Sequence, residues 1–285
     1  MSPHRFIHRR MRSAQLAWTL LVALATCLLG CGGTSKPAAR ETMLEDMVLV
    51  PAGDFLMGLD QGASSTDESP QHRVWLGDFY IDRTEVTNAQ FKAFCDATER
   101  IYPNNPSWEE GYFLAKPDHP VVSITWEQAR AYCEWAGKRL PSEAEWEKAA
   151  RGTDGQLYSW GNTWDPERAN VWGDTSGADR FRRTAPVGSI PKGQSPYGAV
   201  DMIGNVWEWC ADWFDEHYYA TSPERDPRGP SKPTVFRVVR GGGFSSPRVP
   251  TGDTVVANRS KNPPTQPIDR LGCRCAWSKG FKKKR

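Results

Sequence analysis

Apolar and polar positions along the chain predict two extended segments followed by three short helices. Residues 47–58 form a strand-like run bounded by turn residues, and residues 72–82 form a second run of the same kind. After residue 153 the pattern predicts short strands and long loops without a further convincing helix. The chain has no internal repeat, so it does not predict a solenoid or a propeller.

Each of the three predicted helices begins with a capping box. In this motif a Ser or Thr side chain, and a Glu or Gln three residues later, satisfy backbone amides that the first turn leaves without partners. The pairs are Thr87 with Gln90, Thr125 with Gln128, and Ser142 with Glu145. Apolar residues follow each pair: Phe91, Phe94 and Cys95; Ala129, Cys133 and Ala136; Trp146, Ala149 and Ala150. We expect the second and third helices to end at Gly137 and Gly152.

The beginning of the chain predicts a signal peptide over residues 1–30. Arg5, Arg9, Arg10 and Arg12 precede an apolar run over residues 16–29, which is shorter than a membrane span of roughly 20 residues. The run ends in Leu28-Leu29-Gly30-Cys31, which resembles the lipobox of bacterial lipoproteins. We therefore expect an acylated Cys31 and a lipid-anchored protein of the cell envelope, facing the periplasm or the surface. Gly at residue 32, rather than Asp, favours the outer membrane. The alternative is an uncleaved membrane anchor with an incidental cysteine.

Charge and composition restrict the class of the remaining chain. The whole chain carries a formal charge of +2, and the leader holds four arginines and no acid, so the mature chain is close to neutral. This balance gives no basic surface for a nucleic acid. With 13 Trp, 25 Gly and 22 Pro, the chain predicts a loop-rich fold packed around aromatic side chains.

The predicted organisation is a tether over residues 31–46, one domain over residues 47–278 and a basic tail over residues 279–285. We expect the tail to be a solvated terminus. Its alternative role is a contact with an anionic lipid or glycan.

The cysteines after Cys31 are odd in number: Cys95, Cys133, Cys210, Cys273 and Cys275. In an oxidising compartment this count predicts one or two disulfides and at least one unpaired thiol. No Cys-x-x-Cys pair or cluster of His and Cys indicates zinc.

Several motifs are more specific together than any one of them alone. They are Pro51 to Gly58, Phe79 to Asp82 with Glu85 to Asn88, Trp135 to Trp146, Gly204 to Trp209, Arg240 to Phe244, and Leu271 to Cys275. In this order they resemble the sulfatase-modifying factor family, whose founding member is the formylglycine-generating enzyme. The resemblance covers residues 47–278. It implies a loop-rich α+β fold with little regular secondary structure, distantly similar to C-type lectins.

The resemblance also implies two structural calcium sites. The first would use Asn170, Val171, Asp179 and Phe181, and the second would use Asp201, Gly204, Val206 and Glu208. Carboxylate, amide and backbone carbonyl oxygens are the ligands that Ca²⁺ prefers. Asp201 stands where one enzyme branch of the family has Asn, but it still offers oxygen. The alternative is that these residues only form turns and a buried acid.

By the same resemblance, Cys133 and Cys275 match one family disulfide. The second family pair falls on Ala150 and Val256, which is what a bridge replaced by apolar packing would leave. Three cysteines then allow one further bridge and one free thiol: Cys95, Cys210 and Cys273.

The copper site is where the chain departs from the family. The formylglycine-generating enzyme holds copper(I) between two cysteines and uses oxygen to oxidise a cysteine of its substrate sulfatase. Ser246 and Thr251 stand at those positions. Copper(I) is a soft ion that requires thiolates or thioethers, and a neutral hydroxyl cannot replace them. We therefore expect no copper and no formylglycine generation.

Some aromatic and histidine positions have two interpretations. His72 and His119 are expected to be ordinary surface or packing residues. For Trp207, Trp209 and Trp213 core packing is the default, and a platform that stacks a sugar or a peptide is the alternative.

Two functions from different classes remain. The first is a non-catalytic binding or scaffold lipoprotein whose partner is an envelope protein or a peptide. The second is an oxidative maturation enzyme of the broader family, similar to non-haem-iron or siderophore-maturation oxidoreductases. The chain lacks an evident signature of two His and one carboxylate, which favours the first.

Overall fold

The computed structural model describes residues 43–60, 65–172, 181–247 and 252–280. The predicted leader, Cys31, Asp179 and Thr251 lie outside these ranges. None of the helices in the described ranges combines the length and the apolar character needed to cross a membrane.

The two predicted extended segments each divide into two strands and pair with each other. The strands are β1(Met47–Val50), β2(Gly53–Met57), β3(His72–Leu76) and β4(Phe79–Asp82). β1 pairs with β4 and β2 pairs with β3, both antiparallel, so the two segments form one long hairpin that breaks halfway. The break has a physical reason, because Pro51 cannot donate to a ladder.

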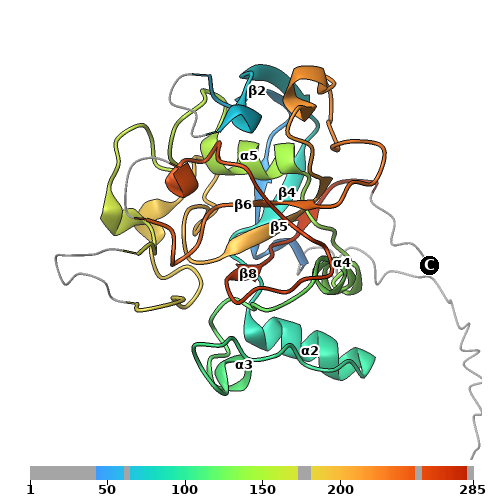
Figure 1. Cartoon of the computed structure of the whole chain (residues 1–285), viewed down its shortest axis with the longest axis vertical. Helices are drawn as coiled ribbons and strands as arrows, with labels where there is room; N and C mark the ends of the chain where they lie inside the picture. The colour runs from blue at the N-terminus through green and yellow to red at the C-terminus, as the bar shows by residue number, and fades with distance from the viewer. Residues whose placement is uncertain (1–42, 61–64, 173–180, 248–251, 281–285) are drawn as a thin grey trace, which may run out of the picture.

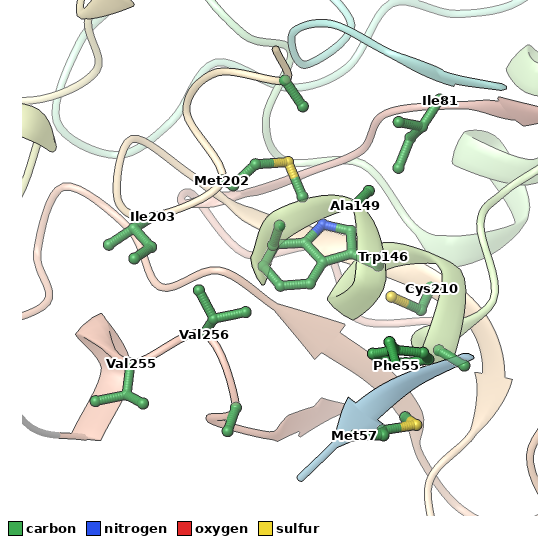
Figure 2. Packing of buried hydrophobic residues seen from close by; sticks show 14 of the residues in the cluster. Phe55, Met57, Ile81, Trp146, Ala149, Met202, Ile203, Cys210, Val255 and Val256 are labelled. Carbon is green, nitrogen blue, oxygen red and sulfur yellow. The ribbon is translucent and has the colours of Figure 1, made fainter. Parts of the chain in front are cut away.

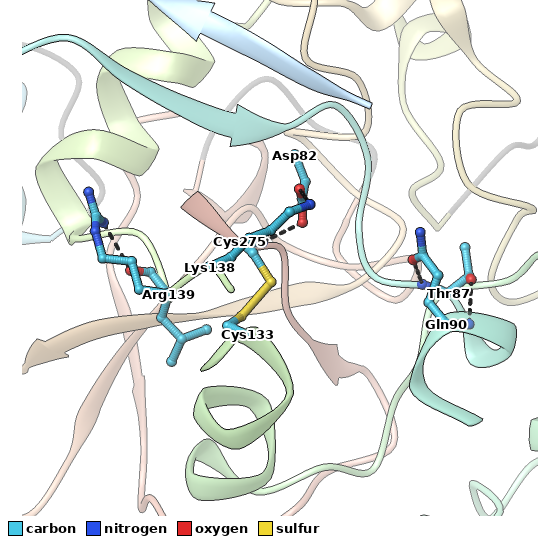
Figure 3. Close-up of a disulfide and its surroundings, with 8 residues drawn as sticks. Asp82, Thr87, Gln90, Cys133, Lys138, Arg139 and Cys275 are labelled. Carbon is cyan, nitrogen blue, oxygen red and sulfur yellow. Dashed lines mark hydrogen bonds and ion pairs between the residues drawn. A yellow bond between two sulfur atoms is a disulfide. The ribbon is translucent and has the colours of Figure 1, made fainter. Parts of the chain in front are cut away.

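All three predicted capping boxes are present, with both hydrogen bonds of each box formed. The helices are α2(Asn88–Thr98), α4(Trp126–Trp135) and α5(Glu143–Arg151). Figure 3 shows the box of α2, in which the Thr87 hydroxyl accepts from the Gln90 amide and the Gln90 side chain accepts from the Thr87 amide. A fourth helix, α3(Tyr112–Ala115), was not predicted, because a single turn is too short to show helical spacing.

The second half of the chain forms the largest sheet. Its strands are β5(Trp207–Trp213), β6(Arg237–Arg240), β7(Ser260–Asn262) and β8(Leu271–Gly272), in the order β7-β6-β5-β8. The last strand, β9(Ala276–Trp277), returns to the first sheet and pairs with β4. Short 3-10 turns complete the fold: η1(Thr66–Glu68), η2(Pro166–Arg168), η3(Pro191–Gly193), η4(Tyr218–Thr221) and η5(Gly252–Thr254). The prediction of no α-helix after α5 therefore holds in the described ranges, and Figure 1 shows long loops around a small centre of strands and helices.

Helix α5 occupies this centre and packs against β2, β4, β5 and β6. All of its residues are buried, although its sequence has one apolar face and five charged residues. Arginines, all but one supplied by other elements, make this burial tolerable, because a buried charge needs a partner. The ion pairs are Glu143 with Arg240 and Arg259, Glu145 with Arg139 and Arg228, and Glu147 with Arg240 and with Arg151 of α5 itself.

Apolar side chains from distant segments meet around Trp146 of α5. Figure 2 shows Phe55, Met202 and Val256 gathered around the helix. Ala150 and Val256 are both buried in this cluster. The two positions of the second family disulfide are therefore filled by apolar packing.

The structure joins Cys133 of α4 to Cys275 by a disulfide, as the resemblance implies (Figure 3). The further disulfide that the three remaining cysteines would allow is not formed. Cys95, Cys210 and Cys273 are all free, and all three are buried. The odd count is thus resolved as one bridge and three free thiols.

Candidate functional site

The two calcium sets meet just before β5, where Asn170 of the first set lies beside Gly204 of the second. Asn170 and Gly204 form an isolated parallel bridge, and the Asn205 amide donates to the Asn170 carbonyl at 2.8 Å. Gly204 has a φ of 84°, and a Cβ atom there would lie 2.4 Å from the Asn170 carbonyl oxygen. Only glycine allows this approach, so the Gly-Asn motif fixes the contact between the two sets.

Asn205 connects the two sets through its side chain. Its amide group donates to Glu85 Oε1 at 2.8 Å, while its Oδ1 accepts from the Asn170 side chain at 3.1 Å and from the Ala185 amide at 2.8 Å. Asn205 adopts a left-handed conformation with a φ of 58°, which Asn tolerates better than most residues. The result is one buried polar network that reaches from Asn170 to Glu85.

Glu85 and Asp201 form the most unusual electrostatic feature of this network. Glu85 is buried, and its Oε2 atom has no hydrogen-bond partner. Burial raises the pKa of Glu85 well above its usual value, and the nearby Asp201 raises that pKa further. Asp201 accepts the Gly188 amide at 2.6 Å, yet burial raises its pKa as well. Two buried carboxyl groups so close together require a shared proton or a cation.

The other members of the second set fit a cation less directly. Glu208 accepts two hydrogen bonds from Arg274, both at 2.7 Å, and one from the Trp146 indole at 2.8 Å. Gly204 and Val206 would contribute backbone carbonyls only. Within the described ranges no three His, Cys, Asp or Glu side chains converge as metal ligands. A Ca²⁺ ion here would therefore rely on Asp201 and Glu85 together with backbone oxygens.

Only part of the first set is described. Asn170 and Val171 are buried, and Phe181 is half-buried. The Asn170 Nδ2 atom donates both to the Arg183 carbonyl at 2.8 Å and to Asn205 Oδ1 at 3.1 Å, so the Asn170 side-chain oxygen is the atom that could serve as a ligand. Asp179, the only acid of this set, lies outside the described residues.

Ser246, which the resemblance places at the first copper-cysteine position, belongs to a closed hydrogen-bonded turn. Ser246 is 2% exposed. Its hydroxyl accepts the Gly243 amide at 3.0 Å and donates to Asp253 Oδ2 at 3.0 Å. Gly242 adopts a φ of 73°, and a Cβ atom there would lie 2.5 Å from the Asp253 carbonyl. Thr251, at the second cysteine position, lies outside the described residues.

Aromatic side chains lie beside this turn. The Trp172 amide donates to the Ser246 carbonyl at 2.9 Å, and the Trp172 side chain is 62% exposed. Trp108 packs edge-on against Tyr112 and Phe244, and its buried indole nitrogen has no partner. The surface next to Ser246 therefore offers the exposed ring of Trp172, whereas the Trp108 indole nitrogen is buried.

The free thiols are in apolar surroundings. Burial raises the pKa of Cys210 and Cys273 well above the usual value, and it raises the pKa of Cys95 as well. A soft metal ion requires the thiolate, which burial disfavours. The described thiols thus show none of the features of an activated cysteine.

The remaining candidates are structural. Trp207 and Trp209 are buried in the core, as the default interpretation predicts, and Trp213 stacks on the guanidinium of Arg237. His72 packs edge-on against Tyr219. His119 contacts the Thr184 hydroxyl at 2.9 Å, and burial lowers its pKa.

No role for Glu85, Asn205 or Arg274 was predicted from the sequence. All three lie inside motifs that carried the family resemblance, so the motifs were found but the long-range partners of their side chains were not. Partners separated by more than sixty residues, such as Glu208 and Arg274, leave no periodic signal in one sequence.

Comparison with the sequences of known proteins supports the family resemblance. Residues 33–279 match the family model described as a sulfatase-modifying factor enzyme 1-like domain. The chain is 37% identical to the formylglycine-generating enzyme of Streptomyces coelicolor over 84% of this chain and 91% of that protein. It is also 33% identical to a Bos taurus protein named inactive C-alpha-formylglycine-generating enzyme 2, over 82% of this chain and 89% of that protein.

Solved structures give the same result. PvdO from Pseudomonas aeruginosa superposes with a TM-score of 0.67 at 28% identity, covering 81% of this chain and 94% of PvdO. Treponema denticola variable protein 1 superposes with a TM-score of 0.63 at 25% identity, with the same coverage.

Proposed function

Because the chain belongs to the sulfatase-modifying factor family, we propose that it is an envelope lipoprotein whose formylglycine-generating-enzyme-like domain binds a partner without catalysing the family's oxidation. The lipid anchor would be Cys31. The partner would be an envelope protein or a peptide that contacts the aromatic surface beside Ser246.

One observation carries the non-catalytic part of this proposal. The Ser246 hydroxyl is buried between the Gly243 amide and the Asp253 carboxylate, where it serves as the centre of a turn. A copper(I) ion needs two soft ligands that face a common space. Ser246 supplies a hard atom that already has both a donor and an acceptor.

The free cysteines support the same conclusion. None of the three described thiols is exposed, and burial raises the pKa of each. Moreover, a family relative that is 33% identical carries the word inactive in its name. The fold therefore accommodates members that are regarded as non-catalytic.

Binding is supported by the surface next to the turn. Trp172 exposes most of its ring, and a large exposed aromatic side chain is typical of binding surfaces. Trp108 packs edge-on against Phe244 of the same segment, and its buried indole N–H is not accessible to a partner. An exposed ring beside a backbone turn suits a peptide segment that stacks on Trp172.

Calcium fits this proposal as a structural ion. The Glu85 Oε2 atom lacks a donor, and Asp201 lies next to it, so a divalent cation would satisfy both carboxylates. When bound, Ca²⁺ would supply charge neutralisation and hold the Gly204 turn against Asn170. In the second set Asp201 and Glu85 would hold it with the backbone oxygens of Gly204 and Val206, while Glu208, which the resemblance also implies, has both carboxylate oxygens bound by Arg274. In the first set the residues expected to hold it are Asn170, Val171, Asp179 and Phe181.

The test of the non-catalytic function uses the purified full chain in detergent. It is titrated with copper(I) against a colorimetric chelator, and it is then incubated with copper, oxygen, reductant and a cysteine-containing sulfatase peptide. We expect no competition for copper and no aldehyde by mass spectrometry. Aldehyde above a no-protein control would overturn the proposal, and Cys210→Ser and Cys273→Ser would then identify the thiol responsible.

Two additions make the experiment specific. The triple variant Ser246→Cys, Thr251→Cys and Asp253→Asn tests whether positions 246 and 251 correspond to the copper cysteines. A gain of copper affinity requires that the two thiols face each other, and Asp253→Asn removes the carboxylate that would disfavour the thiolate at position 246. Metal analysis of the aerobically purified protein tests the oxidative-enzyme alternative, for which stoichiometric iron would be the expected result.

The lipid anchor is tested separately. Cys31→Ser should block processing of the leader or release the protein from the membrane fraction, and the mass of the mature amino terminus should lose the acyl groups. A variant that is processed and retained on the membrane like the natural protein would contradict lipidation at Cys31.

A further inference from the structure

The sheet formed by β1, β4 and β9 has one face in the core and one face directed outward. Val50, Phe79 and Ile81 belong to the core face. On the other face Leu49 lies opposite Tyr80, and Tyr80 lies opposite Trp277, so the three side chains form a row across the sheet. Tyr80 and Trp277 contact each other edge-on, with ring centroids 5.8 Å apart.

This outward row is apolar where alternation predicts polar residues. Leu49 is 46% exposed, and Tyr80 and Trp277 are half-buried. Trp and Tyr together with an aliphatic side chain are the residue types that occupy the interface between membrane and water, because their rings are partly apolar and partly polar.

Both ends of the described chain approach the same segment beside this sheet. Met43 Sδ lies 3.6 Å from the point where a side chain on Gly137 would begin. The Ser278 hydroxyl accepts a hydrogen bond from the Arg139 side chain. The backbone amides of Arg139 and Ala276 each donate to the carbonyl of the other residue. Figure 3 shows Lys138 and Arg139 next to Cys275, immediately before β9. The chain therefore enters and leaves the domain at one edge of the outward row.

The sequence beyond these two ends has the chemistry of membrane attachment. Cys31 precedes Met43 by twelve residues, which reach about 40 Å when fully extended. The other end continues into a tail with five cations: Lys279, Lys282, Lys283, Lys284 and Arg285. Three acids, Glu41, Glu45 and Asp46, closely precede β1, so the sequence after β9 holds more cations than the sequence just before β1 holds acids.

We propose that the row of Leu49, Tyr80 and Trp277 is the surface that the domain lays on an anionic lipid bilayer, with the basic tail contacting the phosphates. The proposal rests on the lipid anchor at Cys31. The short tether keeps the domain within about its own diameter of the bilayer. Cationic residues near an anionic surface are attracted to it, which would give the domain a preferred orientation.

The experiment measures the depth of single positions in the full chain. Leu49→Cys is labelled with an environment-sensitive fluorophore, and the protein is reconstituted in vesicles of phosphatidylglycerol and phosphatidylethanolamine that contain nitroxide-labelled lipid. Labelling is selective because Cys95, Cys210 and Cys273 are buried. We expect the nitroxide lipid to quench the fluorophore at position 49. The control is Leu114→Cys on α3, labelled in the same way, which should keep its emission; Leu114 is 60% exposed.

The basic tail is tested in the same assay. Replacement of Lys282, Lys283, Lys284 and Arg285 by Gln should reduce the loss of emission at position 49, as should replacing phosphatidylglycerol by phosphatidylcholine. Unchanged quenching in the tail variant would overturn the part that we assign to the tail.

Three results would overturn the inference as a whole. Equal quenching at positions 49 and 114 would mean that the domain has no preferred face. A blue-shifted emission at position 49 without nitroxide quenching would mean that a protein, such as a second copy, covers the row. No change at position 49, in a protein whose acylated Cys31 is verified by mass spectrometry, would reject the surface while leaving the anchor intact. If Cys31 is not acylated, the anchor fails, and vesicles added to the free protein must still quench position 49 for the surface to stand.

Discussion

The Arg274 guanidinium holds the Glu208 carboxylate through two hydrogen bonds of 2.7 Å, and neither side chain reaches solvent. Arg274→Met would leave Glu208 charged and buried without its partner. We expect the free energy of unfolding, measured by urea denaturation, to fall by about 3–5 kcal/mol. The matched control is Arg130→Met, whose exposed pairs with Glu127 and Glu134 should be worth less than about 1 kcal/mol. Similar losses in the two variants would contradict a central role for the buried pair.

Calcium is expected to stabilise the native protein. A ligand that binds only the native state adds about 2.7 kcal/mol at a hundredfold excess over its dissociation constant, so Ca²⁺ should raise the melting temperature and a chelator should lower it. Asp201→Ala and Asp179→Ala should each weaken this response. Glu208→Ala is less informative, because it also removes the partner of Arg274.

Asp96→Ala is a suitable control for the calcium experiment, because Asp96 is an exposed acid that pairs with Lys92. Its calcium response should equal that of the natural protein. Melting curves of the natural protein that ignore both calcium and chelator would exclude occupied structural sites.

The stability of the protein is expected to depend on pH through Asp212. Burial raises the pKa of Asp212 to about 7, and repulsion from Glu143 contributes next. An unfolded Asp ionises near about 3.9. Between these values the native protein keeps a proton that the unfolded chain has lost. The free energy of unfolding therefore falls as pH rises from about 4 to 7, by at most about 1.4 kcal/mol per unit, and this contribution is constant above 7.

Asp212→Asn isolates this contribution, because the amide oxygen still accepts the Glu143 amide that Asp212 holds at 2.9 Å. Relative to the natural protein, the variant should become progressively more stable from pH 4 to pH 7, with no further gain at higher pH. Urea denaturation curves that stay parallel over this range would show that Asp212 does not titrate as its environment implies.

The disulfide is expected to be a major source of stability, because Cys133 and Cys275 are separated by 142 positions. Replacing both by Ala should cost about 2–5 kcal/mol. Reductant should destabilise the natural protein to a similar extent and leave the double variant unchanged. A thiol reagent should modify no cysteine of the native domain. After denaturation without reductant it should modify three: Cys95, Cys210 and Cys273. Fewer than three would reveal a second bridge.

Local signals in the sequence predicted local structure well. The boxes at Thr87, Thr125 and Ser142 define helix beginnings through contacts only three residues apart, and the structure forms all of them. The extended segments were predicted as two continuous strands, because the break at Pro51 depends on which partner each half pairs with.

Burial was less predictable than secondary structure. Helix α5 has the charge content of a solvent-exposed helix, and its complete burial depends on Arg139, Arg240 and Arg259 arriving from other segments. The position of Ser246 could be assigned from the motif around it. Its hydrogen bond to Asp253 could not, because no local rule pairs those two side chains.

On the proposed non-catalytic function, the contact between Ser246 and Asp253 would also make the copper site difficult to regain. A thiol introduced by Ser246→Cys would face a carboxylate at about the distance of a hydrogen bond, and a negative charge disfavours the thiolate. A second cysteine at position 251 would then add little until Asp253 also changed, for example to Asn. By this reasoning a return to the family's oxidation would require three substitutions, and the first two would bring little benefit without the third.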